Sequence, residues 1–250
     1  YGDKTHPVED AGELLGEEIK RAEQDGGTLL IPAFSLERTQ EILHKIDHLK
    51  RTKVIKNETP VYMDSPMAIK ATAVFEGFKD LYNKELADHA KTDDPFEFPG
   101  LVRVQHGWES KKIKDQIGAK VIIAGSGMMT GGRIIHHAID FLGSDSNAVL
   151  FVGFQGEETL GRKIMDGEKK VWISGVEVEI KARVREIRAM SAHADQPRLL
   201  HWISQIKGVK TAILTHGEEI PRLTLAEKIK NEVEVRDVRL PKLGEEIDFS

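Results

Sequence analysis

Apolar and polar residues alternate along the chain with two periods, one typical of helices and one typical of strands. In residues 9–25, apolar positions recur at three- and four-residue spacing, and Asp25-Gly26-Gly27 ends the pattern. Residues 28–32 (TLLIP) form a short apolar run between turn signals, which indicates a buried strand. The same patterns predict helices at 35–49, 64–82, 133–142, 197–206 and 220–231, and strands at 59–63, 120–124, 148–153, 210–215, 233–240 and 246–249.

Local signals refine the predicted elements. Ser35 stands where a serine cap would begin the helix at 35–49. The segment Asp64-Ser65-Pro66 combines a capping residue with a proline in the first turn of the next helix. Residues 170–184 alternate apolar and polar positions, which predicts an antiparallel ribbon that turns near Gly175. Because strands and helices alternate with short connections, the pattern predicts an α/β fold.

Composition narrows the class of protein. The 250 residues suit one large or two smaller domains, and 40% hydrophobic with 31% charged residues is typical of a soluble globular protein. No apolar run approaches the ~20 residues needed to span a bilayer, so we expect no membrane partner. The chain has no cysteine, which excludes disulfides and thiolate metal sites and is consistent with a cytoplasmic location. A net charge of −5 disfavours coating of nucleic acid by bulk charge but permits a local basic groove.

Polar loops follow several of the predicted strands. In open α/β sheets, ligands bind outside the carboxyl ends of the strands, so we expect these loops to converge there. They are residues 32–38 (PAFSLER), 63–66 (MDSP), 125–133 (GSGMMTGGR), 191–195 (SAHAD) and 215–218 (THGE).

The loop at residues 125–132 holds four glycines between a strand and a helix. Its backbone amides could cradle a phosphate at the helix N-terminus. It matches neither a Walker loop nor GxGxxG, and a tight turn that needs positive φ explains the glycines equally well. Both interpretations stay open from the residues alone.

Two histidines stand out by their positions. His193 and His216 each follow an apolar strand and are flanked by small or acidic residues. Imidazole is a common metal ligand and a proton carrier near neutral pH. A zinc site needs three or four ligands, so these two alone do not make one. The H-x-x-D-H segment that contains His44 and His48 is interpreted as a solvated helix face, because charged residues surround it.

The remaining histidines give weaker signals. His136 and His137 are likewise interpreted as part of a solvated helix face, because helix neighbours point about 100° apart and cannot easily share a metal. His89 and His201 are interpreted as ordinary surface or boundary residues.

Taken in chain order, a series of motifs resembles the β-CASP branch of the metallo-β-lactamase superfamily, whose members include metal-dependent ribonucleases. The motifs are YGDKTH, PAFSLERTQEIL, DSPMA, GSGMMTGGR, FVGFQGEETLGRKI, SAHAD and THGE. The resemblance implies that residues 9–190 form a β-CASP domain, a mainly parallel sheet flanked by helices. It implies that residues 1–8 end an N-terminal metallo-β-lactamase half and that residues 191–250 are the C-terminal portion of that αββα fold.

The resemblance also assigns roles to individual residues. His193 corresponds to the histidine thought to act as general acid or leaving-group stabiliser, and His216 to a zinc ligand. The family places the GSGM loop near the active-site cleft, so Ser126 and Arg133 become candidate phosphate contacts, with Arg38 and Ser191 as weaker ones. The implied substrate is RNA, and a deep cleft between domains favours a single strand.

The chain also departs from the family pattern. The H-x-H-x-D-H motif and the bridging aspartate, which supply most ligands of a two-zinc site, do not occur in it. We therefore expect a fragment that is inactive alone, with most zinc ligands in a missing N-terminal half. That half, or a second copy of the chain in a homodimer, would cover apolar surface left exposed in residues 191–250. The same ligand types also accept manganese.

Two other functions are alternatives to the ribonuclease. One is a non-catalytic RNA-binding or scaffold subunit of the same family, which the presence of both His193 and His216 disfavours. The other is a Rossmann-like enzyme that binds a nucleotide or sugar through the glycine-rich loop. The lack of GxGxxG with an acidic residue ~20 positions later disfavours that function.

Overall fold

The computed structural model describes residues 2–248, and these residues form two compact units. Residues 9–190 make up the first, which we call the sheet unit. The N-terminal residues up to Val8 pack with the segment that begins at Ser191 in the second, which we call the terminal unit.

The sheet unit is built on a six-stranded sheet in the order β3-β2-β4-β1-β5-β8, and neighbouring strands in it pair in parallel. The strands are β1 (Thr28–Pro32), β2 (Val61–Met63), β3 (Leu101–Arg103), β4 (Lys120–Ala124), β5 (Ala148–Phe151) and β8 (Arg183–Glu186). The helices are α1 (Ala11–Asp25), α2 (Arg38–Arg51), α3 (Pro66–Gly77), α4 (Lys84–Ala90), α5 (Gly107–Lys112), α6 (Ile134–Phe141) and α7 (Leu160–Met165). The α/β fold with a mainly parallel sheet flanked by helices is thus confirmed.

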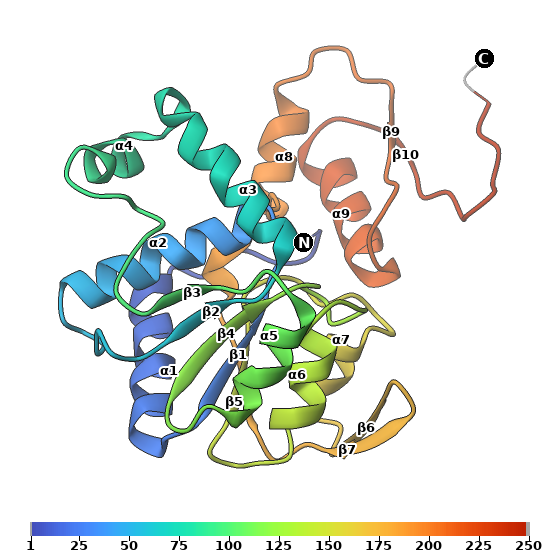
Figure 1. Cartoon of the computed structure of the whole chain (residues 1–250). Coiled ribbons are helices and arrows are strands. Elements are labelled where there is room, and N and C mark those ends of the chain that lie inside the picture. The colour runs from blue at the N-terminus through green and yellow to red at the C-terminus, as the bar shows by residue number, and fades with distance from the viewer. Residues whose placement is uncertain (1, 249–250) are drawn as a thin grey trace. The chain divides into compact units, whose positions relative to one another are not determined.

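Both faces of the sheet are covered, which explains why its central strands are apolar throughout. Leu29 and Ile31 of β1 point into a core shared with α1, α2 and α3, whereas Leu30 points into a second core shared with α6 and α7. Figure 1 shows α1 and α2 on one side of the sheet and α5 and α6 on the other. All five residues of β1 and all five of β4 are buried. A two-faced core of this kind is typical of parallel sheets.

Several predicted boundaries shift in the structure. Helix α2 begins at Arg38 without a side-chain cap, so the predicted cap at Ser35 is wrong. Ser65 caps α3, because its Oγ accepts the backbone N–H of Ala68 at 3.1 Å. The predicted ribbon is only β6 (Lys170–Ile173) and β7 (Val176–Glu179), since the residues of β8 leave it and pair with β5.

The terminal unit combines two helices with a pair of parallel strands. These are α8 (Gln196–Ser204), β9 (Thr211–Ile213), α9 (Glu219–Glu232) and β10 (Asp237–Arg239). Their small core includes Ile203, Ala212, Leu225 and Val238. The strand predicted at 246–249 is wrong for residues 246–248, which are not in a strand, and its last residue lies outside the described residues.

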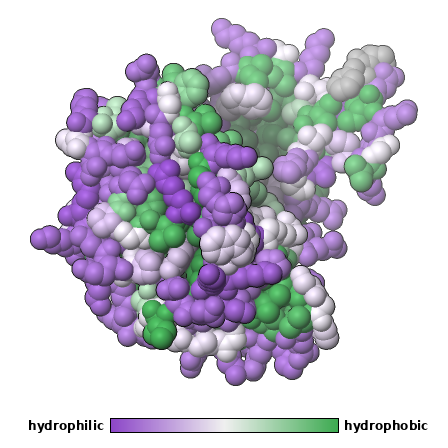
Figure 2. Space-filling model, in the orientation of Figure 1, coloured by the Kyte–Doolittle hydropathy of each residue, from purple (hydrophilic) through white to green (hydrophobic). Residues whose placement is uncertain are grey.

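The surface of the molecule is mixed in character. Figure 2 shows a largely hydrophilic face with separate apolar patches. Several large apolar side chains are exposed, among them Trp108, Trp172 and Trp202. Within residues 2–248, no helix has the length and apolar character needed to cross a membrane.

Candidate functional site

A pocket of about 550 Å³ lies at the carboxyl ends of β1, β2 and β4. These strands are adjacent and parallel, so their carboxyl ends share one edge of the sheet. The pocket is lined by Ser35 after β1, by Asp64, Ser65, Pro66, Met67 and Lys70 after β2, and by Gly125, Ser126, Gly132 and Arg133 after β4. The structure thus brings together three of the loops that were expected to converge, at the edge where such sheets bind ligands.

The carboxylate of Asp64 is the centre of a buried polar network at this edge. Its Oδ2 accepts hydrogen bonds from Ser110 Oγ at 2.5 Å and from His137 Nε2 at 2.6 Å. Its Oδ1 accepts one from Arg133 Nη1 at 2.6 Å. Burial alone raises the pKa of Asp64, but the hydrogen bonds from His137, Ser110 and Arg133 outweigh it and hold the pKa below the ordinary 3.8. Asp64 is therefore a fully satisfied, ionised carboxylate.

His137 does not behave as the sequence suggested. It was grouped with His136 on a solvated helix face, but its side chain is only 2% exposed and pairs with Asp64. His136 beside it is exposed, which fits the angle between neighbours on a helix. The apolar stripe of α6 signals one buried face, yet nothing in the local sequence marks a carboxylate as the partner of His137.

Arg133 lines the pocket, and its guanidinium already donates hydrogen bonds to three acceptors. Besides Asp64, Nη1 donates to the carbonyl oxygen of Val104 at 3.0 Å, and Nη2 donates to that of Gln105 at 2.7 Å. The side chain is 21% exposed. Its positive charge is thus fixed at the pocket and braces the segment after β3 against α6.

The glycine-rich loop is held together by its own hydrogen bonds. Ser126 Oγ accepts the backbone N–H of Thr130 at 2.8 Å and lies 3.1 Å from Thr130 Oγ1. Gly132 has a φ of +77°, and a Cβ there would lie 2.2 Å from the carbonyl oxygen of Gly125. The tight-turn explanation therefore accounts for Gly132. Ser126 is nevertheless one of the residues that line the pocket.

Arg38 lies apart from the residues that line this pocket. Its guanidinium pairs with Glu41 one turn along α2, and its side chain is 13% exposed. Ser35, by contrast, lines the pocket and its Oγ lies 3.1 Å from the Oγ of Ser65.

His193 lies in an exposed loop of the terminal unit that is fastened to the N-terminal segment. The Nε2–H of His6 donates to the carbonyl oxygen of His193 at 2.7 Å, and the backbone N–H of His6 donates to Asp195 Oδ2 at 3.0 Å. The other Asp195 oxygen caps α8 by accepting the backbone N–H of Arg198. Ser191 Oγ lies 3.5 Å from His193 Nδ1. No local pattern in the sequence marks His6, because its partner lies 187 residues away.

His216 lies directly after β9 in the same unit. It is exposed and has a φ of +62°, followed by Gly217 with a φ of +102°. Non-glycine residues with positive φ are uncommon and occur often in turns that present a side chain. The backbone thus turns sharply at His216 before α9 begins.

The described residues do not by themselves fit a zinc site. Within residues 2–248, no group of three or more histidine, aspartate, glutamate or cysteine side chains is arranged to hold a metal ion. Structural and catalytic zinc sites need at least three protein ligands. His216 can therefore contribute to a metal site only together with ligands that this part of the chain does not bring to it.

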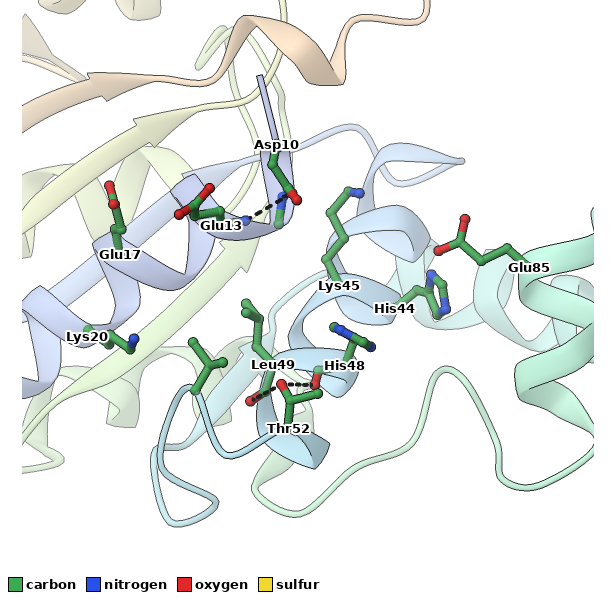
Figure 3. A pocket seen from close by; sticks show the side chains of 12 residues that line it. Asp10, Glu13, Glu17, Lys20, His44, Lys45, His48, Leu49, Thr52 and Glu85 are labelled. Carbon is green, nitrogen blue, oxygen red and sulfur yellow. Dashed lines mark hydrogen bonds between the residues drawn. The ribbon is translucent and has the colours of Figure 1, made fainter. Parts of the chain in front are cut away.

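A second pocket, of about 510 Å³, lies between α1 and α2 and contains the H-x-x-D-H segment. Figure 3 shows Asp10, Glu13 and Glu17 on one side and His44 and His48 on the other. The intervening Asp47 is absent from its lining and is buried, with its Oδ2 3.0 Å from Nε2 of His89 on α4. The interpretation as a wholly solvated face is therefore wrong for Asp47. His89 is partly buried, as expected for a boundary residue.

Comparison with known protein families gives the class of protein. The Beta-Casp domain family matches residues 39–164, and the family described as the Zn-dependent metallo-hydrolase RNA specificity domain matches residues 177–241. This chain belongs to the Beta-Casp family.

Several named proteins are similar to the chain over most of its length. Ribonuclease TTHA0252 of Thermus thermophilus is 35% identical over 248 residues, which cover 98% of this chain and 56% of that protein. RNase aCSPSF2 of Saccharolobus solfataricus is 32% identical over 252 residues, covering 100% of this chain and 47% of that protein. Transcription termination factor FttA of Methanocaldococcus jannaschii is 30% identical over 238 residues, covering 92% and 37%. The chain thus spans about half or less of the length of these relatives.

Proposed function

We propose that this chain is the RNA-handling part of a metal-dependent ribonuclease that hydrolyses phosphodiester bonds. The observation that carries the proposal is the alignment of 98% of the chain with a relative named as a ribonuclease. The match of residues 177–241 to an RNA specificity domain supports RNA as the substrate. The pocket at the edge of the sheet gives the chain a place to hold it.

The metal in this proposal is zinc, bound mostly by ligands outside the chain. The Zn-dependent description of the second matching family supports the choice of metal. His216 supplies one imidazole, and the described residues offer no group of three ligands. The chain alone is then inactive on RNA, and the same ligand types also accept manganese.

His193 serves in the proposal as the acid for the leaving group. Its imidazole gives a proton, or a hydrogen bond, to the departing 3′-oxygen of the cleaved bond. Correct placement of such an acid contributes about 10²–10⁴ in rate. The support from the structure is the fastening of the SAHAD loop through His6 and Asp195, which limits how far His193 can move.

The RNA backbone is proposed to lie against the sheet-edge pocket. Ser126 offers a hydroxyl there, and Arg133 offers a charge whose guanidinium is held in place by Asp64. Ser191 and Arg38 are weaker candidates for contacts with the RNA backbone. Ser191 Oγ lies 3.5 Å from His193 Nδ1, and the guanidinium of Arg38 is already paired with Glu41. A single strand suits this arrangement, because its phosphates and bases are both accessible.

The test uses a protein that joins this chain to a metal-binding half. The His193→Ala variant should retain its zinc, measured by elemental analysis, and lose about 10²–10⁴ of its RNA cleavage rate. The His216→Ala variant should bind less zinc. His201→Ala, which removes an exposed histidine from α8, is the control and should change neither quantity. Full cleavage by His193→Ala would refute the acid role, and unchanged zinc in His216→Ala would refute the ligand role.

A non-catalytic RNA-binding or scaffold subunit is the second candidate. The match of residues 177–241 to a family described as an RNA specificity domain, a description that concerns recognition of RNA, is the observation that favours it. RNA binding without cleavage, in a joined protein that holds its full complement of zinc, would establish this second function.

A further inference from the structure

Trp108 presents an exposed indole on the helix that comes after β3. It is the second residue of α5, which follows directly after β3, the strand beside β2. Its exposed fraction is 59%, and Gln105, His106 and Gly107 before it are exposed as well. A large aromatic side chain held in water is available for contact with a ligand.

Cationic and aromatic groups surround this indole. The His106 ring stacks on it nearly in parallel, with 9° between the planes and 6.1 Å between the centroids. Lys112 Nζ lies 4.9 Å from the centroid of the indole, and Lys111 is exposed beside it. Together these residues form what we call the Trp108 platform: His106, Trp108 and Lys112.

The nearby acid does not cancel this positive charge. Glu109 is the acidic residue of this helix, and its Oε2 accepts the backbone N–H groups of Gln105 at 3.0 Å and His106 at 2.7 Å. The carboxylate thus caps the start of α5. The platform therefore combines an aromatic surface with exposed positive charge.

The segment that carries the platform is bonded, through Gln105 and Ser110, to two residues that line the pocket. The carbonyl oxygen of Gln105 accepts a hydrogen bond from Arg133 Nη2 at 2.7 Å. Ser110 Oγ donates to Asp64 Oδ2 at 2.5 Å. Gln105 and Trp108 are three residues apart, so at most about 11 Å separates their Cα atoms. The backbone of Trp108 is therefore near a residue that is bonded to the pocket lining, and one RNA strand can contact both.

A nucleotide matches the chemistry of this surface. Each base has a π-face that stacks on aromatic rings, and each phosphate is attracted by lysine, which is how single strands are bound without strong sequence preference. The exposed part of the indole and the outer side of the imidazole accept a base, while Lys111 and Lys112 lie where a phosphate would follow.

We propose that the Trp108 platform stacks a base of single-stranded RNA that lies against the sheet-edge pocket. This inference rests on the proposed function, since it adds a contact for the same RNA. It predicts sequence-tolerant binding, because stacking on an aromatic ring accepts any base.

The experiment measures binding of a fluorescein-labelled single-stranded RNA oligonucleotide by fluorescence anisotropy, using the chain as it is. Trp108→Ala should weaken binding about tenfold, whereas Trp108→Phe, which keeps an aromatic ring, should retain most of the affinity. Trp172→Ala is the matched control, because Trp172 is 71% exposed on the β6–β7 hairpin and should not matter. Circular dichroism checks that each variant is folded.

A second readout reports on the indole itself. In a Trp172→Phe, Trp202→Phe background, Trp108 is the remaining tryptophan, and unlabelled RNA should quench its emission. An oligonucleotide without bases should bind wild type and Trp108→Ala equally, because it has nothing to stack.

The outcomes separate this inference from the proposed function. Equal RNA affinity of wild type and Trp108→Ala would overturn the platform and leave the ribonuclease proposal untouched. Loss of affinity in Trp172→Ala as large as in Trp108→Ala would also overturn it, because the effect would then be non-specific. Failure of the chain to bind any RNA would overturn the platform, while cleavage by the joined protein would still decide the nuclease.

Discussion

Arg133 Nη1 lies 2.6 Å from Asp64 Oδ1, and this ion pair joins two of the loops that form the candidate RNA-binding pocket. Asp64 is fully buried and Arg133 is mostly so. Removing one partner of a buried pair leaves the other charge uncompensated, which is far more damaging than losing a surface pair. The pocket thus depends on a network that also stabilises the sheet unit.

The first prediction concerns this network. Asp64→Asn should lower the free energy of unfolding by about 3–5 kcal/mol, because it leaves Arg133 and His137 without their carboxylate. Glu97→Gln removes a surface partner of Arg103 that is 56% exposed, and should cost less than about 1 kcal/mol. Urea denaturation of the chain measures both. Equal effects of the two substitutions would contradict the importance of the buried network.

The second prediction concerns the pH dependence of Asp47. Burial raises the pKa of Asp47 to about 6, with Arg51 opposing the shift, whereas the ordinary value is 3.8. Between about pH 4 and 6 the folded state therefore binds a proton that the unfolded state does not. The contribution of this group to stability is present at low pH and is lost as the pH rises through about 6.

Asp47→Asn tests this sign. The unfolding free energy of the variant, minus that of the wild type, should increase from pH 4 to pH 7. Asp145→Asn makes the same charge change at an exposed position that does not act on Asp47, and it should give a much smaller change of the difference with pH. His44, whose pKa burial lowers, titrates in both proteins, so its contribution largely cancels in the difference. His89 Nε2 lies 3.0 Å from Asp47 Oδ2, so the comparison is repeated in a His89→Gln background. A falling difference for Asp47→Asn would show that the sign is wrong.

The third prediction separates two costs at Gly132. This residue combines a φ of +77° with a carbonyl oxygen 2.2 Å from the position of an added Cβ. Gly118 has a φ of +92° and nothing within 4 Å of that position. Gly118→Ala should therefore show only the backbone cost of about 1–2 kcal/mol, and Gly132→Ala distinctly more. Thermal unfolding measures the loss of stability in each variant. Equal losses would mean that the glycine-rich loop shifts to make room for the added Cβ at residue 132.

How much of the fold and of the candidate site could be predicted from the sequence depended on whether each feature is encoded within a short stretch of residues. Strands β1 and β4 were predicted to the residue, because each is an apolar run bounded by turn signals. Strand β3 has three residues, none of them fully buried, and α5 has six, so neither gave a periodic pattern.

The candidate site was harder to predict than the strands around it. The partners of Asp64 lie 46, 69 and 73 residues away, and no local pattern encodes such pairings. The sequence therefore marked Asp64 only as part of the segment that begins a helix, in which Ser65 is the cap. His193 and His216 were singled out by flanking residues and by resemblance to a family, and their roles stay predictions.

The fourth prediction concerns His6, whose Nε2–H donates to the carbonyl oxygen of His193. His6→Ala removes this bond, so the SAHAD loop should open more often. A hydrogen bond of this kind contributes about 0.5–1.5 kcal/mol, so amide hydrogen exchange at residues 191–196 should become about three- to tenfold faster.

Two further variants separate the hydrogen bond from the loss of a side chain. His6→Gln can place an amide N–H near the same carbonyl and should restore most of the protection. His201→Ala removes another exposed histidine of the terminal unit and should leave exchange in residues 191–196 unchanged. Unchanged exchange in His6→Ala would show that the backbone N–H of His6, through Asp195, suffices to hold the loop. Slower cleavage by His6→Ala in the joined protein, with RNA affinity unaltered, would extend the effect from the loop to the placement of His193.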